Sequence, residues 1–172
     1  HNGHTVTLRD LMLRGSDTAA LFAIVHVEVD TTHAGDILSS SMRWDNVRIV
    51  GGNIYSEYGV LYRKAPGSLS QMNDLSVWNH TDIAKVRRAA FASEDDNSLM
   101  HSFNDCKFTY VGRGTPGGTD GWDDYPTDEG YAVWIKKGSF RWTKGYMGVV
   151  KGAGFRIDQA NLHLIDEGVA PL

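Results

Sequence analysis

Runs of alternating apolar and polar residues recur along this chain, and each run follows a polar residue that is usually Asn or Asp. The stretch SMRWDNVRIVGGN (Ser41 to Asn53) closely matches the later stretch SFNDCKFTYVGRG (Ser102 to Gly114). Apolar residues at every second position predict strands with one buried face. A single copy indicates an ordinary strand, whereas several copies predict a repeating architecture.

Five copies can be aligned on the polar residue, although the last copy is weaker. The aligned residues are Asp10, Asn46, Asp74, Asp105 and Asn161, at successive spacings of 36, 28, 31 and 56 residues. The last spacing is twice 28, as though one copy had lost its polar turn. The apolar residues after each polar residue are expected to point inward: Leu11, Leu13, Val47, Ile49, Leu75, Val77, Cys106, Phe108, Leu162 and Leu164.

A second apolar phrase runs out of phase with the first and predicts a second strand in each repeat. Its copies are AALFAIVHV, YGVLYRK, YAVWIKKG and YMGVVKG. Helical periodicity is nearly absent. One stretch, Thr81 to Asp95, is compatible with a helix that begins at Thr81 as N-cap and has Ile83, Val86 and Ala90 on one side.

Strands that recur without crossover helices predict a solenoid, because each coil supplies the connection that parallel strands need. Asn and Asp tolerate left-handed backbone conformations and bond to nearby backbone groups, so they suit the corner between two strands. We therefore expect the polar residues to be structural, with Asn46, Asp74 and Asp105 stacked as a ladder of hydrogen bonds.

Three segments carry a resemblance to a known family: MRWDNVRIVGG, HSFNDCKFTYVG and YMGVVKGAGFRIDQANLHLIDEG. They resemble the right-handed parallel β-helix of the pectin-lyase-like superfamily, and within it the tailspike and tail-fibre proteins of bacteriophages. The resemblance implies an all-β, right-handed parallel β-helix, and the repeat spacing predicts about five or six coils, with one long loop insertion. Residues 1–172 would form one domain, and the first residue, His1, together with the length of family subunits, indicates a segment of a longer protein.

The same resemblance implies a homotrimer in a virion tail or another extracellular setting, with a bacterial surface polysaccharide as partner. The net charge of −4 and the pI of about 5.9 argue against nucleic acid as a partner. The longest apolar run, Ala19 to Val25, is too short to span a bilayer, so no membrane insertion is expected. The single cysteine, Cys106, gives no disulfide framework and is expected to be a small buried residue.

The long loop GRGTPGGTDGWDDYPTDEG (Gly112 to Gly130) departs most from the repeat and interrupts it between two strands. An aromatic side chain among carboxylates is typical of sugar sites, and two carboxylates at a suitable separation can hydrolyse a glycosidic bond. The alternative is a solvated acidic loop whose Trp122 only packs. The loop's candidate catalytic residues are Asp120, Asp123, Asp124, Asp128 and Glu129, and its candidate substrate-binding residues are Trp122 and Tyr125.

A second acidic cluster, SEDDN (Ser93 to Asn97), adds Glu94 and Asp95 as candidate substrate-binding residues, although an ordinary turn explains it as well. Neither cluster has the spacing of a calcium loop, and no cofactor or metal is expected. No Ser nucleophile elbow, phosphate loop or dinucleotide fingerprint is present. If the loop does not bind, the strand faces still offer tryptophans as candidate platforms: Trp44, Trp78, Trp134 and Trp142.

Three functions remain open from the sequence. The first is a bacteriophage tailspike or tail-fibre segment that recognises a bacterial surface polysaccharide, with or without depolymerising it. The second is a bacterial polysaccharide lyase or glycosidase with the same fold. The third is a purely structural solenoid of a virion or cell surface. The residues alone do not decide whether the chain is an enzyme.

Overall fold

The computed structural model describes residues 4–29, 40–64, 73–94, 100–112 and 130–165. These residues form eleven strands and no helix, and every strand pair is parallel, which confirms the all-β expectation. The strands are β1 (His4–Arg14), β2 (Ala23–Val29), β3 (Ser40–Val50), β4 (Ser56–Lys64), β5 (Asn73–Asn79), β6 (Asp82–Ser93), β7 (His101–Asn104), β8 (Lys107–Val111), β9 (Tyr131–Thr143), β10 (Tyr146–Val150) and β11 (Phe155–Ile165).

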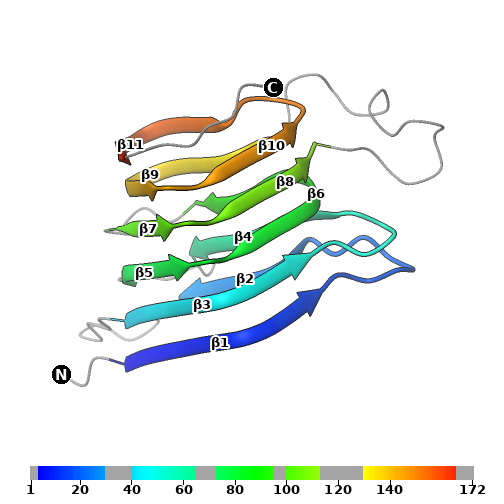
Figure 1. Cartoon of the computed structure of the whole chain (residues 1–172), viewed down its shortest axis with the longest axis horizontal. Coiled ribbons are helices and arrows are strands. Elements are labelled where there is room, and N and C mark those ends of the chain that lie inside the picture. The colour runs from blue at the N-terminus through cyan, green and yellow to red at the C-terminus, as the bar shows by residue number, and fades with distance from the viewer. Residues whose placement is uncertain (1–3, 30–39, 65–72, 95–99, 113–129, 166–172) are drawn as a thin grey trace.

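Parallel pairing arranges the strands in three columns, and the longer strands contribute to two columns each. The first column holds the first halves of β1 and β3, then β5 and β7, then the second halves of β9 and β11. The second column holds the second halves of β1 and β3, the first half of β6, then β8 and β10. The third column holds β2, β4, the second half of β6 and the first halves of β9 and β11. Figure 1 shows β1, β3, β5 and β7 side by side, beginning near the N-terminus.

The bend between the first and second columns lies at residues with positive φ: Asp10, Asn46, His80, Asp105 and Lys144. Three of these corners match the aligned polar residues. The assignments at Asp74 and Asn161 are wrong, because these residues lie in β5 and β11. His80 and Lys144 show why the pattern missed two corners: a left-handed conformation favours Asn and Asp without requiring them.

A hydrogen-bond ladder exists, but not at the predicted residues Asn46, Asp74 and Asp105, because it lies one residue before the corner. Asn104 Nδ2 donates to Asn79 Oδ1 at 2.9 Å, and Asn79 Nδ2 donates to Asp45 Oδ1 at 2.6 Å. The bond from Asn79, together with Arg43, lowers the pKa of the Asp45 carboxyl. Within the predicted set, Asn46 does pair at its corner, since its Nδ2 donates to Asp10 Oδ1 at 2.8 Å.

The possible helix from Thr81 to Asp95 is wrong, because Asp82–Ser93 within it form strand β6. Thr81 is buried and bonds to the Asn79 carbonyl, so it caps nothing. Strand β6 pairs with β3, β4, β8 and β9, and this pairing on both edges outweighs the local helix propensity. A positive φ at Lys85 bends the strand between the second and third columns.

The core confirms most of the expected inward residues. Val47, Ile49, Cys106 and Phe108 are buried, and Leu11 and Leu13 in β1 pack against the core. The prediction that Leu75 and Val77 point inward is wrong by one position, because Ser76 and Trp78 are buried instead and Leu75 is 37% exposed. The side chains of Leu162 and Leu164 lie outside the described set.

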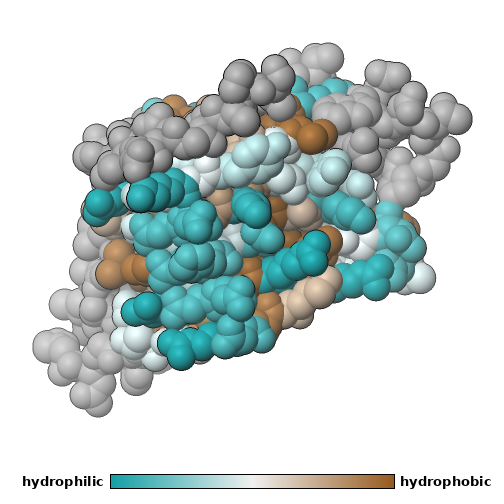
Figure 2. Space-filling view, in the orientation of Figure 1, coloured by the Kyte–Doolittle hydropathy of each residue, from teal (hydrophilic) through white to brown (hydrophobic). Residues whose placement is uncertain are grey.

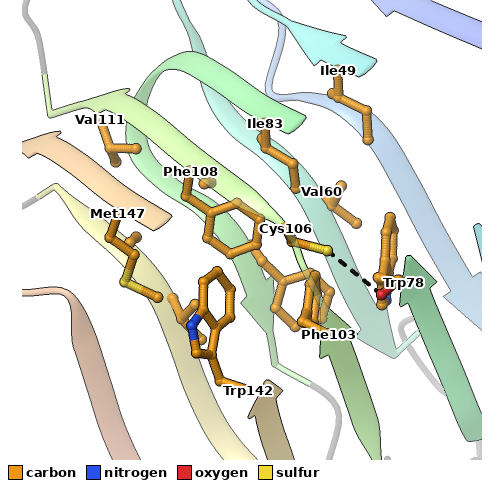
Figure 3. Close-up of a cluster of buried hydrophobic side chains, with 14 of the residues drawn as sticks. Ile49, Val60, Trp78, Ile83, Phe103, Cys106, Phe108, Val111, Trp142 and Met147 are labelled. Atoms are coloured by element: carbon orange, nitrogen blue, oxygen red, sulfur yellow. Dashed lines mark hydrogen bonds between the residues drawn. The ribbon is translucent and has the colours of Figure 1, made fainter. Parts of the chain in front are cut away.

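Aromatic rings stack inside the first column. Trp44 and Trp78 are stacked with centroids 4.3 Å apart, and Trp78 stacks on Phe103 at 5.2 Å. Figure 3 shows Trp78, Phe103, Phe108 and Trp142 pointing into one cluster with Cys106, Ile83 and Val60. Trp44, Trp78 and Trp142 are therefore packing residues and cannot serve as surface platforms.

The outer surface over the first and second columns is mainly hydrophilic in the view of Figure 2, with isolated hydrophobic patches. Outward positions carry charged or polar side chains such as Arg43, Arg48, Lys107 and Arg141, as period-two alternation requires. Within the described ranges, no helix has the length and hydropathy to cross a membrane.

Candidate functional site

The long loop predicted from the sequence leaves and re-enters the fold through a narrow neck made by Gly112 and Gly130. A Cβ on Gly130 would lie 2.7 Å from the Gly112 Cα, and both glycines have positive φ. Val111 pairs with Val86, and Tyr131 pairs with Ala89. Gly112 and Gly130 are therefore aligned with Arg87 and Arg88 of the neighbouring strand β6. The chain between the two glycines is an insertion at a bend.

The loop residues between the two glycines lie outside the described part of the structure. This applies to the seven loop candidates and also to one of the two candidates in the second acidic cluster. Those residues are Asp120, Trp122, Asp123, Asp124, Tyr125, Asp128 and Glu129, with Asp95. Of the predicted site residues, Glu94 alone falls within a described range.

A cluster of charged and aromatic side chains begins directly after the neck, on the face of the third column that points away from the core. We call it the Trp134 cluster, and it contains Tyr131, Trp134 and Lys136 from β9, Arg156 and Asp158 from β11, and Glu94 after β6. Register brings them together, because β11 pairs Arg156 with Trp134, and β6 pairs Ala92 with Trp134.

The indole of Trp134 joins both a hydrogen bond and two cation–π contacts. Its Nε1 donates to Asp158 Oδ2 at 3.1 Å. The Arg156 guanidinium carbon lies 4.5 Å from the ring centroid, and the Lys136 ammonium lies 5.0 Å from it. Such contacts contribute about 0.5–1 kcal/mol each at exposed sites.

Arg156 links the two aromatic rings of the cluster. Its Nε donates to Asp158 Oδ1 at 3.3 Å, and its Nη1 donates to the Tyr131 hydroxyl at 3.3 Å. The Trp134 hydrogen bond, followed by Arg156 and Lys136, lowers the pKa of the Asp158 carboxyl, which is therefore ionised at neutral pH. Lys136 also pairs with Glu94 Oε1 at 3.3 Å, which brings Glu94 into the cluster.

The inner side of Trp134 packs against a second apolar cluster, separate from the main core. This cluster consists of Tyr58, Leu61, Ala89 and Ala92. Leu61 lies between Val60 and Tyr62, which face the main core, so alternation places Leu61 on the opposite face of the column. Trp134 is half-buried because it rests on this apolar support while its polar edge meets Asp158.

This arrangement can bind a ligand that has both apolar faces and hydroxyl groups. Tyr131 and Trp134 supply apolar surface, Asp158 and Glu94 supply acceptors, and Arg156 and Lys136 supply donors. From the sequence, Trp134 was expected only as one of several platforms, and Tyr131, Arg156 and Asp158 were not expected at the site. The sequence did carry a signal, because Trp134 and Lys136 are alternate residues of one predicted strand, and Arg156 and Asp158 are alternate residues of another. Only the register between these two strands shows that the two pairs of side chains meet.

The buried titratable groups are unsuited to catalysis. Burial raises the pKa of the Cys106 thiol to about 12, so the thiol stays protonated. His101 is fully buried between Ser76 Oγ and Ser93 Oγ, and burial lowers its pKa to about 3. The described residues contain no group of three or more potential metal ligands.

The chain matches no protein-family model, no curated protein and no solved structure.

Proposed function

We propose that this chain is a right-handed parallel β-helix segment that recognises a bacterial surface polysaccharide through the Trp134 cluster. The three columns of parallel strands and the repeated left-handed corners support the β-helix. The resemblance to tailspike and tail-fibre proteins supports the setting, which is a trimeric assembly in a virion tail or at another extracellular site.

One observation carries the assignment of the binding site. A half-buried tryptophan lies on the outer face of the third column, and its indole donates to a carboxylate that an arginine also holds. Sugars present an apolar face together with hydroxyl groups, so an aromatic ring with adjacent donors and acceptors matches their chemistry. The cluster also begins at Tyr131, directly after Gly130.

The test is binding of the wild-type chain to a panel of bacterial capsular polysaccharides and lipopolysaccharide O-chains, measured by calorimetry. For a glycan that binds, Trp134→Ala should weaken the affinity about tenfold or more, equivalent to about 1.4 kcal/mol. Asp158→Asn keeps the size of the side chain and should also weaken binding. This variant replaces Trp134→Ala in the test if Trp134→Ala fails to fold. Tyr146→Ala is the control, since Tyr146 is 41% exposed on β10 in the second column.

Release of reducing ends from the bound glycan would show that the chain also depolymerises it. Glycan binding that survives both Trp134→Ala and Asp158→Asn would move the site away from this cluster. A panel without any binder would reject polysaccharide recognition and favour the purely structural role.

A further inference from the structure

Two cations of this chain already occupy the ring of Trp134, the residue on which the glycan site is centred. The Arg156 guanidinium carbon lies 4.5 Å from the ring centroid, and the Lys136 ammonium lies 5.0 Å from it. The inner side of the indole packs against the second apolar cluster, so a ligand and the two cations compete for what remains of the ring. Which cation gives way decides which chemical group of the ligand takes its place.

Arg156 is the more firmly held of the two cations. Its Nε donates to Asp158 Oδ1, and its Nη1 donates to the Tyr131 hydroxyl. The guanidinium carbon also lies 5.2 Å from the centroid of the Tyr131 ring, so Arg156 contacts two rings at once. Asp158 gives one oxygen to Arg156 and the other to Trp134 Nε1, so each oxygen already has a donor. Arg156 and Asp158 therefore form the fixed part of the site.

Lys136 is held by fewer contacts. Its ammonium contacts the Trp134 ring and pairs with Glu94 Oε1 at 3.3 Å. The side chains of Lys136 and Glu94 are 40% and 25% exposed, and an ion pair at such a surface contributes little. Lysine also carries its charge on a flexible four-carbon stem, whereas the guanidinium of arginine is planar and rigid. Lys136 is therefore the group that a ligand displaces.

The position of the Lys136 ammonium has a defined chemistry on two sides, an aromatic ring and a carboxylate. Within the described residues, Glu94 forms no other ion pair, and its Oε2 has no hydrogen-bond partner. When Lys136 moves away, a negative charge is left unpaired beside an electron-rich ring. A ring face attracts cations, and a carboxylate accepts only from donors. The group that replaces Lys136 best is therefore another ammonium.

We propose that this position is a subsite for a protonated amino group of the glycan. The amino group takes over both contacts, to the Trp134 ring and to Glu94 Oε1, while Lys136 moves into solvent. One ammonium replaces another, so the charge of the site is conserved. The net charge of −4 favours the approach of such a cationic polymer. The inference rests on the proposed function, and it narrows the ligand to a polysaccharide with free rather than N-acetylated amino groups.

The experiment compares glucosamine oligosaccharides with the same oligosaccharides after N-acetylation, by calorimetry at about pH 5.5, where an ordinary carboxylate is still ionised. The wild-type chain should bind the amino form more tightly. Glu94→Gln keeps the size of the side chain without its charge, and it should reduce this preference about fivefold, the scale of one exposed charge contact. Lys136→Met removes the competing ammonium and should raise the preference about two- to fivefold.

Glu28→Gln is the matched control, because Glu28 lies on β2 of the same column and also pairs with a cation, His26. An equal loss in Glu28→Gln and Glu94→Gln would show non-specific attraction of a cationic oligosaccharide and would overturn the proposal. Weaker binding of the amino form by Lys136→Met would overturn it too, since Lys136 would then hold the ligand itself.

The remaining outcomes separate this inference from the proposed function. Equal wild-type affinity for the two forms, or no binding of either while a glycan of the bacterial panel binds, would overturn the amino subsite and leave polysaccharide recognition intact. No binding of the glucosamine oligosaccharides or of any panel glycan would reject both.

Discussion

Trp44 and Trp78 stack face to face inside the first column, with ring planes 6° from parallel. Both residues are almost completely buried, and they come from β3 and β5, two successive passes of the chain. The stack therefore ties neighbouring passes together in the core, where a polysaccharide cannot reach it.

Replacing Trp78 with alanine should destabilise the protein by about 3–5 kcal/mol, because the change removes two stacked contacts and leaves a cavity. It also removes the indole that donates to Ser76 Oγ at 3.0 Å. Urea unfolding would measure the loss. Leu75→Ala on the same strand is the control and should cost far less, since Leu75 is partly exposed. Equal losses for the two variants would contradict the assignment of Trp78 to the core.

Gly51→Ala should be severely destabilising for a different reason. A Cβ at this position would lie 1.8 Å from the Lys85 carbonyl oxygen, which belongs to the backbone and cannot rotate away. Gly154→Ala is the matched control, because its nearest neighbour is Met147 Sδ at 3.4 Å, an ordinary contact. The thermal midpoints of the two variants provide the comparison, and a Gly51→Ala protein as stable as Gly154→Ala would show that the passes pack less closely here.

Val149→Asn should stabilise the protein by up to about 1 kcal/mol. Val149 has φ of 58°, and a left-handed conformation costs a residue with a Cβ about 1–2 kcal/mol, which asparagine partly avoids. The substitution also removes some packing, because Val149 is only half-exposed. Thr109→Asn, at a nearby position without positive φ, should give no such gain when both are measured by urea unfolding.

Stability should fall as the pH drops through the window from about 6.5 to about 3. His101 has an ordinary pKa near 6.5 in the unfolded chain, and burial lowers its pKa to about 3 in the folded protein. The unfolded state therefore binds the extra proton in this window, and His101 contributes a slope of up to about 1.4 kcal/mol per pH unit.

His101→Gln keeps hydrogen-bonding capacity toward Ser76 and Ser93 but removes this titration, so its free energy of unfolding should depend less steeply on pH. His26→Gln on β2 is the matched control, and urea unfolding between pH 4 and 7 gives both slopes. If the slopes of the wild-type protein and His101→Gln coincide, His101 does not remain neutral in the folded state.

The sequence by itself determined the class of fold, because alternation is a local property of each strand. Val47, Ile49, Cys106 and Phe108 face inward as period two requires, and the corners at Asp10, Asn46 and Asp105 adopt the left-handed conformation that their polar side chains favour. The sequence also located the insertion between Gly112 and Gly130, since its composition departs from the repeat.

Only the tertiary structure decided register, and register changed the remaining assignments. Leu75 was expected inside the core and Trp78 on the surface, and the structure shows the reverse. The reason is that β5 aligns Trp78 with Trp44 rather than Asp74 with Asn46. The same pairing between strands, which no local pattern encodes, makes Asp82–Ser93 a strand instead of the expected helix. It also brought Arg156 and Asp158 against Trp134, because residues more than twenty positions apart meet only when successive passes of the chain lie in register.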